Sequence, residues 1–130
     1  MATSSATTRG VQVDVESEYV ADRSDPLKGR YFFAYHIRIS NVGDETVQLL
    51  SRHWIITNAD GVKEEVRGPG VIGEQPKLSP GEHFEYTSFC PLSTPMGVMY
   101  GTYQMVTDRG ENFDATIAPF TLSQEVVVYH

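Results

Sequence analysis

Cysteine is almost absent from the chain, since only one of its 130 residues is a cysteine, Cys90. A single cysteine excludes an internal disulfide, and it cannot form a cysteine zinc site without other ligands. No apolar run approaches the roughly 18 residues that span a membrane, and the polar start MATSSATTRG has no apolar signal segment. We therefore expect a cytoplasmic protein with no role inside a membrane.

Basic residues are also scarce. The sequence has 10 Lys and Arg against 17 Asp and Glu, which gives a formal net charge of −7. Non-specific binding to nucleic acid requires a concentrated positive charge, so we expect no nucleic-acid partner. The acidic excess is interpreted as a solubilising surface.

The sequence lacks any convincing run of apolar residues at helical spacing. Segments such as Val11–Glu16 and Tyr31–Ser40 instead alternate apolar with polar residues, which is the pattern of half-buried strands. Turn signals such as Asp60 followed by Gly61 separate the segments at intervals typical of a sandwich. We predict an all-β, immunoglobulin- or fibronectin type III-like sandwich of about seven antiparallel strands, with Trp54 as an anchor of its core.

The length is that of one domain. Residues 1–9 are polar and low in complexity, which favours a disordered tail. Residues 10–122 are expected to form the sandwich domain. Residues 123–130 are expected to form a C-terminal tail, whose structure the pattern leaves open.

The segment RGPGVIGEQP, from Arg67 to Pro76, spells G-x-G-x-x-G. The dinucleotide-binding form of this motif needs a strand before it and a helix that opens at it. Pro76, Pro80 and Gly81 follow within a few residues, and a helix cannot continue through them. The motif therefore lies in a loop of a β protein.

Two interpretations of this loop remain open. Backbone N–H groups at three glycines, with Arg67 as the charge partner, are able to form an anion site for phosphate, pyrophosphate or a nucleotide; the glycines are Gly68, Gly70 and Gly73. The same glycines also suit a tight path between sheets. Glu65 and Glu74 flank the loop and oppose an anion, so the structural interpretation is favoured.

Metal ligands do not form a clear pattern. The four histidines, His36, His53, His83 and His130, include no pair two residues apart on one strand, although His36 and His83 are candidates to meet across strands. Acidic residues on turns, Asp22 with Asp25 and Asp108 with Glu111, suit a hard cation such as Mg²⁺. Isolated acids on turns are usually solvated, so weak binding of magnesium or cobalt stays a minor alternative, with no cofactor expected.

No arrangement of residues indicates catalysis. Cys90 lies in SFCPLSTP without a neighbouring histidine to lower its pKa, so a buried and inert thiol is expected. The serines and threonines show no nucleophile-elbow pattern. We predict that the protein is not an enzyme.

Three blocks together carry a family resemblance: LLSRHWIITNADG (Leu49–Gly61), EVRGPGVIGEQPKLSPGE (Glu65–Glu82) and YTSFCPLSTPMGVMYGTYQM (Tyr86–Met105). They resemble the ApaG family of small bacterial proteins over about Val11–Leu122. The resemblance implies a fibronectin type III sandwich, and it brings a genetic association with cobalt and magnesium efflux. The family pattern supplies no catalytic residue. The same domain type is attached to eukaryotic proteins, including an F-box protein and a polymerase-delta-interacting protein, which implies binding to partner proteins.

The sequence thus favours a non-enzymatic binding module that contacts a partner protein through its loops, a sheet face or an exposed edge strand. An exposed edge is able to add a partner strand or to form a homodimer. Its link to cobalt and magnesium resistance would be indirect. The alternatives are a phosphate-containing ligand at the Gly68–Gly73 loop and weak divalent-metal binding.

Overall fold

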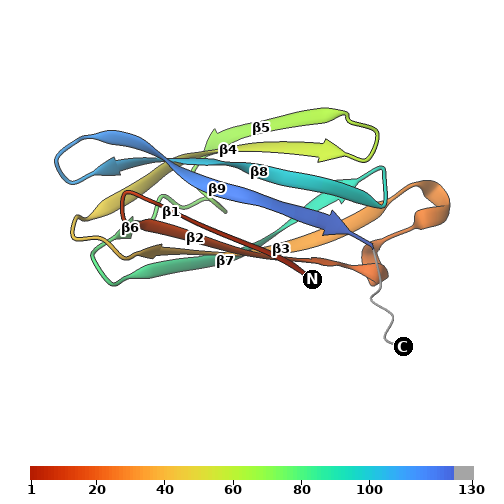
Figure 1. Cartoon of the computed structure of the whole chain (residues 1–130), viewed down its shortest axis with the longest axis horizontal. Coiled ribbons are helices and arrows are strands. Elements are labelled where there is room, and N and C mark those ends of the chain that lie inside the picture. The colour runs from red at the N-terminus through yellow and green to blue at the C-terminus, as the bar shows by residue number, and fades with distance from the viewer. Residues whose placement is uncertain (125–130) are drawn as a thin grey trace.

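The computed structural model describes residues 1–124, so residues 125–130 of the expected C-terminal tail lie outside the described residues. Within that span the strands form two antiparallel sheets packed as a sandwich, which confirms the predicted fold class (Figure 1). The four-stranded sheet has the order β1 (Ala2–Thr8), β2 (Val11–Tyr19), β3 (Tyr31–Asn41) and β7 (His83–Leu92). The five-stranded sheet has the order β5 (Lys63–Pro69), β4 (Val47–Asn58), β8 (Met96–Thr107) and β9 (Asn112–Ser123), with β6 (Lys77–Leu78) beside β4.

Helical structure in the described residues is limited to two 3-10 turns, η1 (Ala21–Arg23) and η2 (Pro26–Lys28), between β2 and β3. None of the helices in residues 1–124 is long and apolar enough to cross a membrane.

The core follows from the alternation in the sequence. Every second residue of β2 and β3 points between the sheets, and Val11, Val13 and Ile37 are fully buried there. Trp54 is 2% exposed and packs edge-on against aromatic rings of both sheets. Its ring centroid lies 5.4 Å from that of Tyr35 and 6.0 Å from that of Phe120. The predicted role of Trp54 as a core anchor is confirmed.

The N-terminal segment differs from the prediction. Ala2–Thr8 forms strand β1, which pairs with β2 in a continuous antiparallel register, so the expected disordered tail over residues 1–9 is wrong. Its serines and threonines find partners that local composition does not reveal. The hydroxyl of Ser4 donates to the carbonyl of Ala118 (2.8 Å), and the N–H of Thr116 donates to Oγ1 of Thr8 (3.0 Å). With β1 and the short β6, residues 1–124 form nine strands instead of about seven.

The two long edges of the sandwich differ. At one edge β1 lies against β9, so the two sheets are joined there (Figure 1). At the other edge lie β7 of the first sheet and β5 of the second, which Figure 1 draws at the bottom and the top of the view. The sandwich is therefore closed along β1 and β9 and open between β5 and β7.

Candidate functional site

The glycine segment begins on β5 and ends in a tight hairpin. The N–H of Gly70 donates to the carbonyl of Leu50 (2.8 Å), where the β4 register is interrupted by a bulge. Val71 and Glu74 then exchange two backbone hydrogen bonds, of 2.8 and 2.9 Å. The backbone donors of Gly70, Val71 and Glu74 are thus used within the fold, which leaves fewer of them for an anion.

The structure separates Arg67 from the glycines that follow it. Arg67 lies opposite His53 and its side chain is 72% exposed, with Nη2 3.9 Å from Oε1 of Glu65. Successive residues of a strand point to opposite faces, so Arg67 points to the outer face while Val66 and Gly68 point inward. Within the predicted anion-binding set, Arg67 and Gly68 therefore point to opposite faces of β5, and Gly70 and Gly73 lie in the hairpin beyond the strand.

The basic side chain that the glycine segment holds is Arg52, from β4. Its Nη1 donates to the carbonyls of Pro69 and Gly70, at 2.9 Å each. The guanidinium lies over Gly68, where a Cβ would come within 2.9 Å of Nη2. Gly68 thus makes room for Arg52. The role of Arg52 depends on its pairing with Gly68, a contact that local sequence patterns do not reveal.

The remaining glycines of the motif satisfy the turn. At Gly70, φ is +59° and a Cβ would lie 2.3 Å from the carbonyl oxygen of Glu74. Ile72 and Gly73 both have positive φ, as the central residues of a type I′ hairpin turn require. The G-x-G-x-x-G pattern is accounted for by this hairpin and by the position of Arg52.

A groove opens between the sheets at the β5 and β7 edges. It consists of a cavity of about 260 Å³ next to one of about 190 Å³, and the two share Ile56, Glu64 and Pro91. Its walls combine apolar side chains, which include Trp54, Ile56, Val66 and Met99, with polar and charged groups. Arg52 and Glu64 add one charge of each sign, and Tyr35 and Ser88 add hydroxyls. A cleft in which apolar side chains and a few polar groups converge is a common form of binding site.

Burial keeps the thiol and the phenol groups near the groove neutral. Burial raises the pKa of the Cys90 thiol from 9.0 to about 11, so the thiol is protonated at neutral pH. Cys90 is 3% exposed, which confirms that this cysteine is buried. Burial also raises the pKa of Tyr35, Tyr86 and Tyr103, and the hydroxyls of Tyr86 and Tyr103 share a hydrogen bond.

The histidines and acids of the sequence analysis are largely paired with each other or with cations. His36 of β3 lies 3.3 Å and His83 of β7 lies 3.9 Å from separate carboxylate oxygens of Glu85. The two histidines therefore share an acidic neighbour, while their register positions, opposite Thr87 and Ser40, lie four residues apart. The hydrogen bond from His36 lowers the pKa of Glu85. Arg9 binds Glu111 (3.0 Å). In the described residues no three His, Cys, Asp or Glu side chains converge to hold a metal, and His130 lies outside that span.

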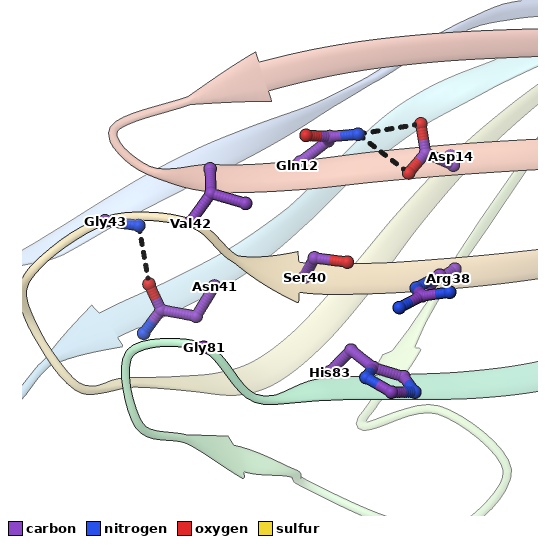
Figure 2. A pocket seen from close by; sticks show the side chains of 9 residues that line it. All are labelled: Gln12, Asp14, Arg38, Ser40, Asn41, Val42, Gly43, Gly81 and His83. Carbon is purple, nitrogen blue, oxygen red and sulfur yellow. Dashed lines mark hydrogen bonds between the residues drawn. The ribbon is translucent and has the colours of Figure 1, made fainter.

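A wider hollow of about 600 Å³ lies on the outer face of the first sheet, and Figure 2 shows the nine residues that line it. Arg38 stands here between Asp14 of β2 and Glu85 of β7, its cross-strand partners. The amide of Gln12 donates to both carboxylate oxygens of Asp14, at 3.0 and 3.2 Å (Figure 2). Because the charges are balanced across strands, this hollow has the character of a solvated sheet face.

Comparison with known proteins places the chain in a family. The sequence model of the ApaG domain matches residues 21–107. The chain belongs to the ApaG family. Among its relatives, Protein ApaG of Anaeromyxobacter dehalogenans strain 2CP-C is 58% identical over 119 residues, which cover 92% of this chain and 94% of the relative. Protein ApaG of Mesorhizobium japonicum is 56% identical over 117 residues, 90% of each chain.

Solved structures agree with this assignment. A crystal structure of a Bordetella pertussis protein described as ApaA is similar with a TM-score of 0.85 and 51% identity, covering 87% of this chain and 92% of that one. The C-terminal domain of wzt shares the fold alone, with a TM-score of 0.55, 12% identity, and coverage of 97% of this chain and 80% of that one. The predicted ApaG resemblance is confirmed.

Proposed function

We propose that this ApaG-family chain is a non-enzymatic module that binds a partner protein by adding an extended segment of it to strand β7. The observation that supports this most directly is the unpaired edge of β7 beside an open groove with mixed apolar and polar walls. In this proposal the link to cobalt and magnesium resistance is exerted through the partner, in the cytoplasm.

The register shows which backbone groups of β7 are free to pair. The N–H of Asn41 donates to the carbonyl of Glu82 (2.9 Å), which fixes the alternation of hydrogen-bonded pairs. Counted from there in steps of two, the residues of β7 that direct their backbone groups toward β3 are Phe84, Tyr86, Ser88, Cys90 and Leu92. Those that direct N–H and C=O groups away from the sheet are His83, Glu85, Thr87 and Phe89.

The two open edges are not equally suited to a partner. β5 is seven residues long and carries Lys63, Glu64, Glu65 and Arg67, the kind of charged edge that discourages strand addition. β7 is ten residues long, and Phe89 on its outer face is 47% exposed. Phe89 stacks on Phe32 with centroids 5.4 Å apart, and the guanidinium of Arg23 lies over both rings. Exposed aromatic and arginine side chains of this kind are typical of binding hot spots.

A proline substitution on the free edge tests the proposal. Thr87→Pro removes an N–H that points away from β3, so the fold is retained while strand addition is blocked. Glu65→Pro is the matched control, since the N–H of Glu65 points away from β4 on the other edge. Tagged wild-type protein, Thr87→Pro and Glu65→Pro are each used to capture proteins from a cytoplasmic extract.

We expect the wild type and Glu65→Pro to retain the same partner and Thr87→Pro to lose it at least ten-fold. Equal capture by all three folded proteins would contradict strand addition at β7.

A further inference from the structure

We propose that the groove between β5 and β7 binds the carboxyl-terminal segment of its partner, with the terminal carboxylate at Arg52 and a basic side chain at Glu64. This inference rests on the proposed function and adds the chemistry of the ligand. It is carried by the groove, by the two opposite charges that line it and by the position of each charge along β4 and β5.

Arg52 provides a fixed cation at one end of the groove. Its Nη1 is held by the carbonyls of Pro69 and Gly70, so the plane of the guanidinium is set before any ligand arrives. The guanidinium has five N–H donors in a fixed fork, and one nitrogen takes both of these bonds, so other donors remain to face a carboxylate. No Asp or Glu of the described residues lies within ion-pair distance of Arg52. Tyr35 and Ser88 line the same cavity and are hydrogen-bonded to each other, so one of the two hydroxyls is left to donate to a carboxylate.

Glu64 provides the opposite charge further along. It pairs with Ile56 of β4, four residues beyond Arg52, which is about 13 Å along an extended strand. Glu64 lies in both parts of the groove, and its charge acts on Cys90 of β7. Within residues 1–124 no Lys, Arg or His forms an ion pair with Glu64. Pro91 follows Cys90 on β7 and has no backbone N–H. An added strand therefore cannot accept a hydrogen bond from this residue.

The two charges give the bound segment a direction. A terminal carboxylate at Arg52 and a basic residue at Glu64 make the segment antiparallel to β7, the pairing of every neighbouring strand in both sheets. Alternate side chains then point into the groove. We expect apolar residues at the last and third-last positions, against Trp54, Val66 and Met99, and Lys or Arg at the fifth-last position, near Glu64.

Peptide selection tests this chemistry directly. The immobilised full-length chain is exposed to a pool of random, N-acetylated heptapeptides with free carboxylates, mixed with a matched pool of carboxamides. Retained peptides are identified by mass spectrometry. We expect at least ten-fold enrichment of acids over amides, with the apolar and basic positions given above. Equal retention of acids and amides, or retention of neither, would overturn the proposal.

Two variants test which end of the groove binds the carboxylate and which end binds the basic side chain. Arg52→Gln is expected to abolish the preference for acids over amides. Glu64→Gln is expected to keep that preference and to lose the preference for a basic residue at the fifth-last position. Arg52→Gln also removes two hydrogen bonds to the glycine segment, so its melting temperature is measured, and Glu64→Gln serves as the variant that leaves those bonds intact. An unchanged acid preference in folded Arg52→Gln would overturn the assignment of the carboxylate.

Different experimental outcomes would refute this inference and the proposed function. Acids and amides retained equally, and both lost in Thr87→Pro, would refute carboxylate recognition while strand addition stands. Retention unaffected by Thr87→Pro would refute both. A concentration-dependent dimer that Thr87→Pro abolishes would place a second copy of this chain on β7 and overturn the assignment to a partner's carboxyl terminus.

Discussion

At the scale of single residues, the glycine motif and the buried polar groups have structural roles that can be measured. Gly68 leaves room for the Arg52 guanidinium, and Gly70 combines φ of +59° with a close approach of Glu74. These constraints explain a G-x-G-x-x-G pattern without a ligand. They also identify Arg52 as the residue through which this motif shapes the groove.

Gly70→Ala is predicted to destabilise the fold by more than Gly61→Ala. Both positions have positive φ, so each alanine carries strain of about 1 kcal/mol. Only at Gly70 does the added Cβ meet another atom, at 2.3 Å, while nothing lies within 4 Å at Gly61. We expect a difference of about 1–3 kcal/mol between the two variants in urea unfolding. Equal losses in the free energy of unfolding would show that the close approach at Gly70 does not contribute to the cost of the substitution.

Cys90 is predicted to make stability depend on pH in the alkaline range. Its folded pKa of about 11 is raised above the ordinary value of 9.0, so the folded state favours the neutral thiol. The contribution of the neutral thiol to the free energy of unfolding is complete below pH 9. It is lost as the pH rises from 9 through 11, by an amount on the order of 2 kcal/mol. The free energy of unfolding of the wild type should therefore fall more between pH 8 and 11 than that of Cys90→Ala. Parallel curves would contradict the shifted pKa.

At the scale of the elements, the sandwich depends on one strand that the sequence does not reveal. β1 is polar, and its contribution comes from its ladder with β2 and its hydroxyl contacts to β9. Neither partner is visible from the composition of residues 1–9. A polar, low-complexity segment is a strand here because its partners lie elsewhere in the chain.

Deletion of residues 2–8 is predicted to lower the free energy of unfolding by at least about 2 kcal/mol. The deletion removes seven residues of backbone pairing and uncovers the edge of β2. Urea unfolding of the shortened and full chains measures the difference. Ser5→Ala, on the exposed face of β1, is a control that keeps the strand. Identical midpoints for the shortened and full chains would restore the disordered-tail interpretation.

The free edge of β7 is predicted from the phase of its hydrogen bonds with β3. Ser88→Pro removes an N–H that faces Tyr35 and should cost about 3 kcal/mol or more, while Thr87→Pro should cost much less. Thermal unfolding of the two variants distinguishes them. A larger loss of stability in Thr87→Pro than in Ser88→Pro would contradict this alternation. It would show that Thr87 pairs with β3 and that the N–H of Ser88 is the free one.

At the scale of the whole molecule, the strand alternation predicts the layers but not which edge stays open. The alternation along Val11–Glu16 and Tyr35–Ser40 is a local pattern, so the sandwich and the burial of Trp54 follow from the sequence. The groove follows instead from the pairing of Arg52 with Gly68 and from the absence of a strand between β5 and β7 in the described residues. Both depend on contacts between distant segments, so local patterns placed the candidate site at Arg67 rather than Arg52.

The measurement that tests the account most directly is amide hydrogen exchange of the full chain, with and without the acid peptides that it retains. Strand addition predicts increased protection at Thr87 and Phe89, with no change at Gly68–Gly73. The control is the matched carboxamides. Protection confined to the glycine segment, or to the outer-face hollow around Arg38, would contradict a partner-binding edge at β7.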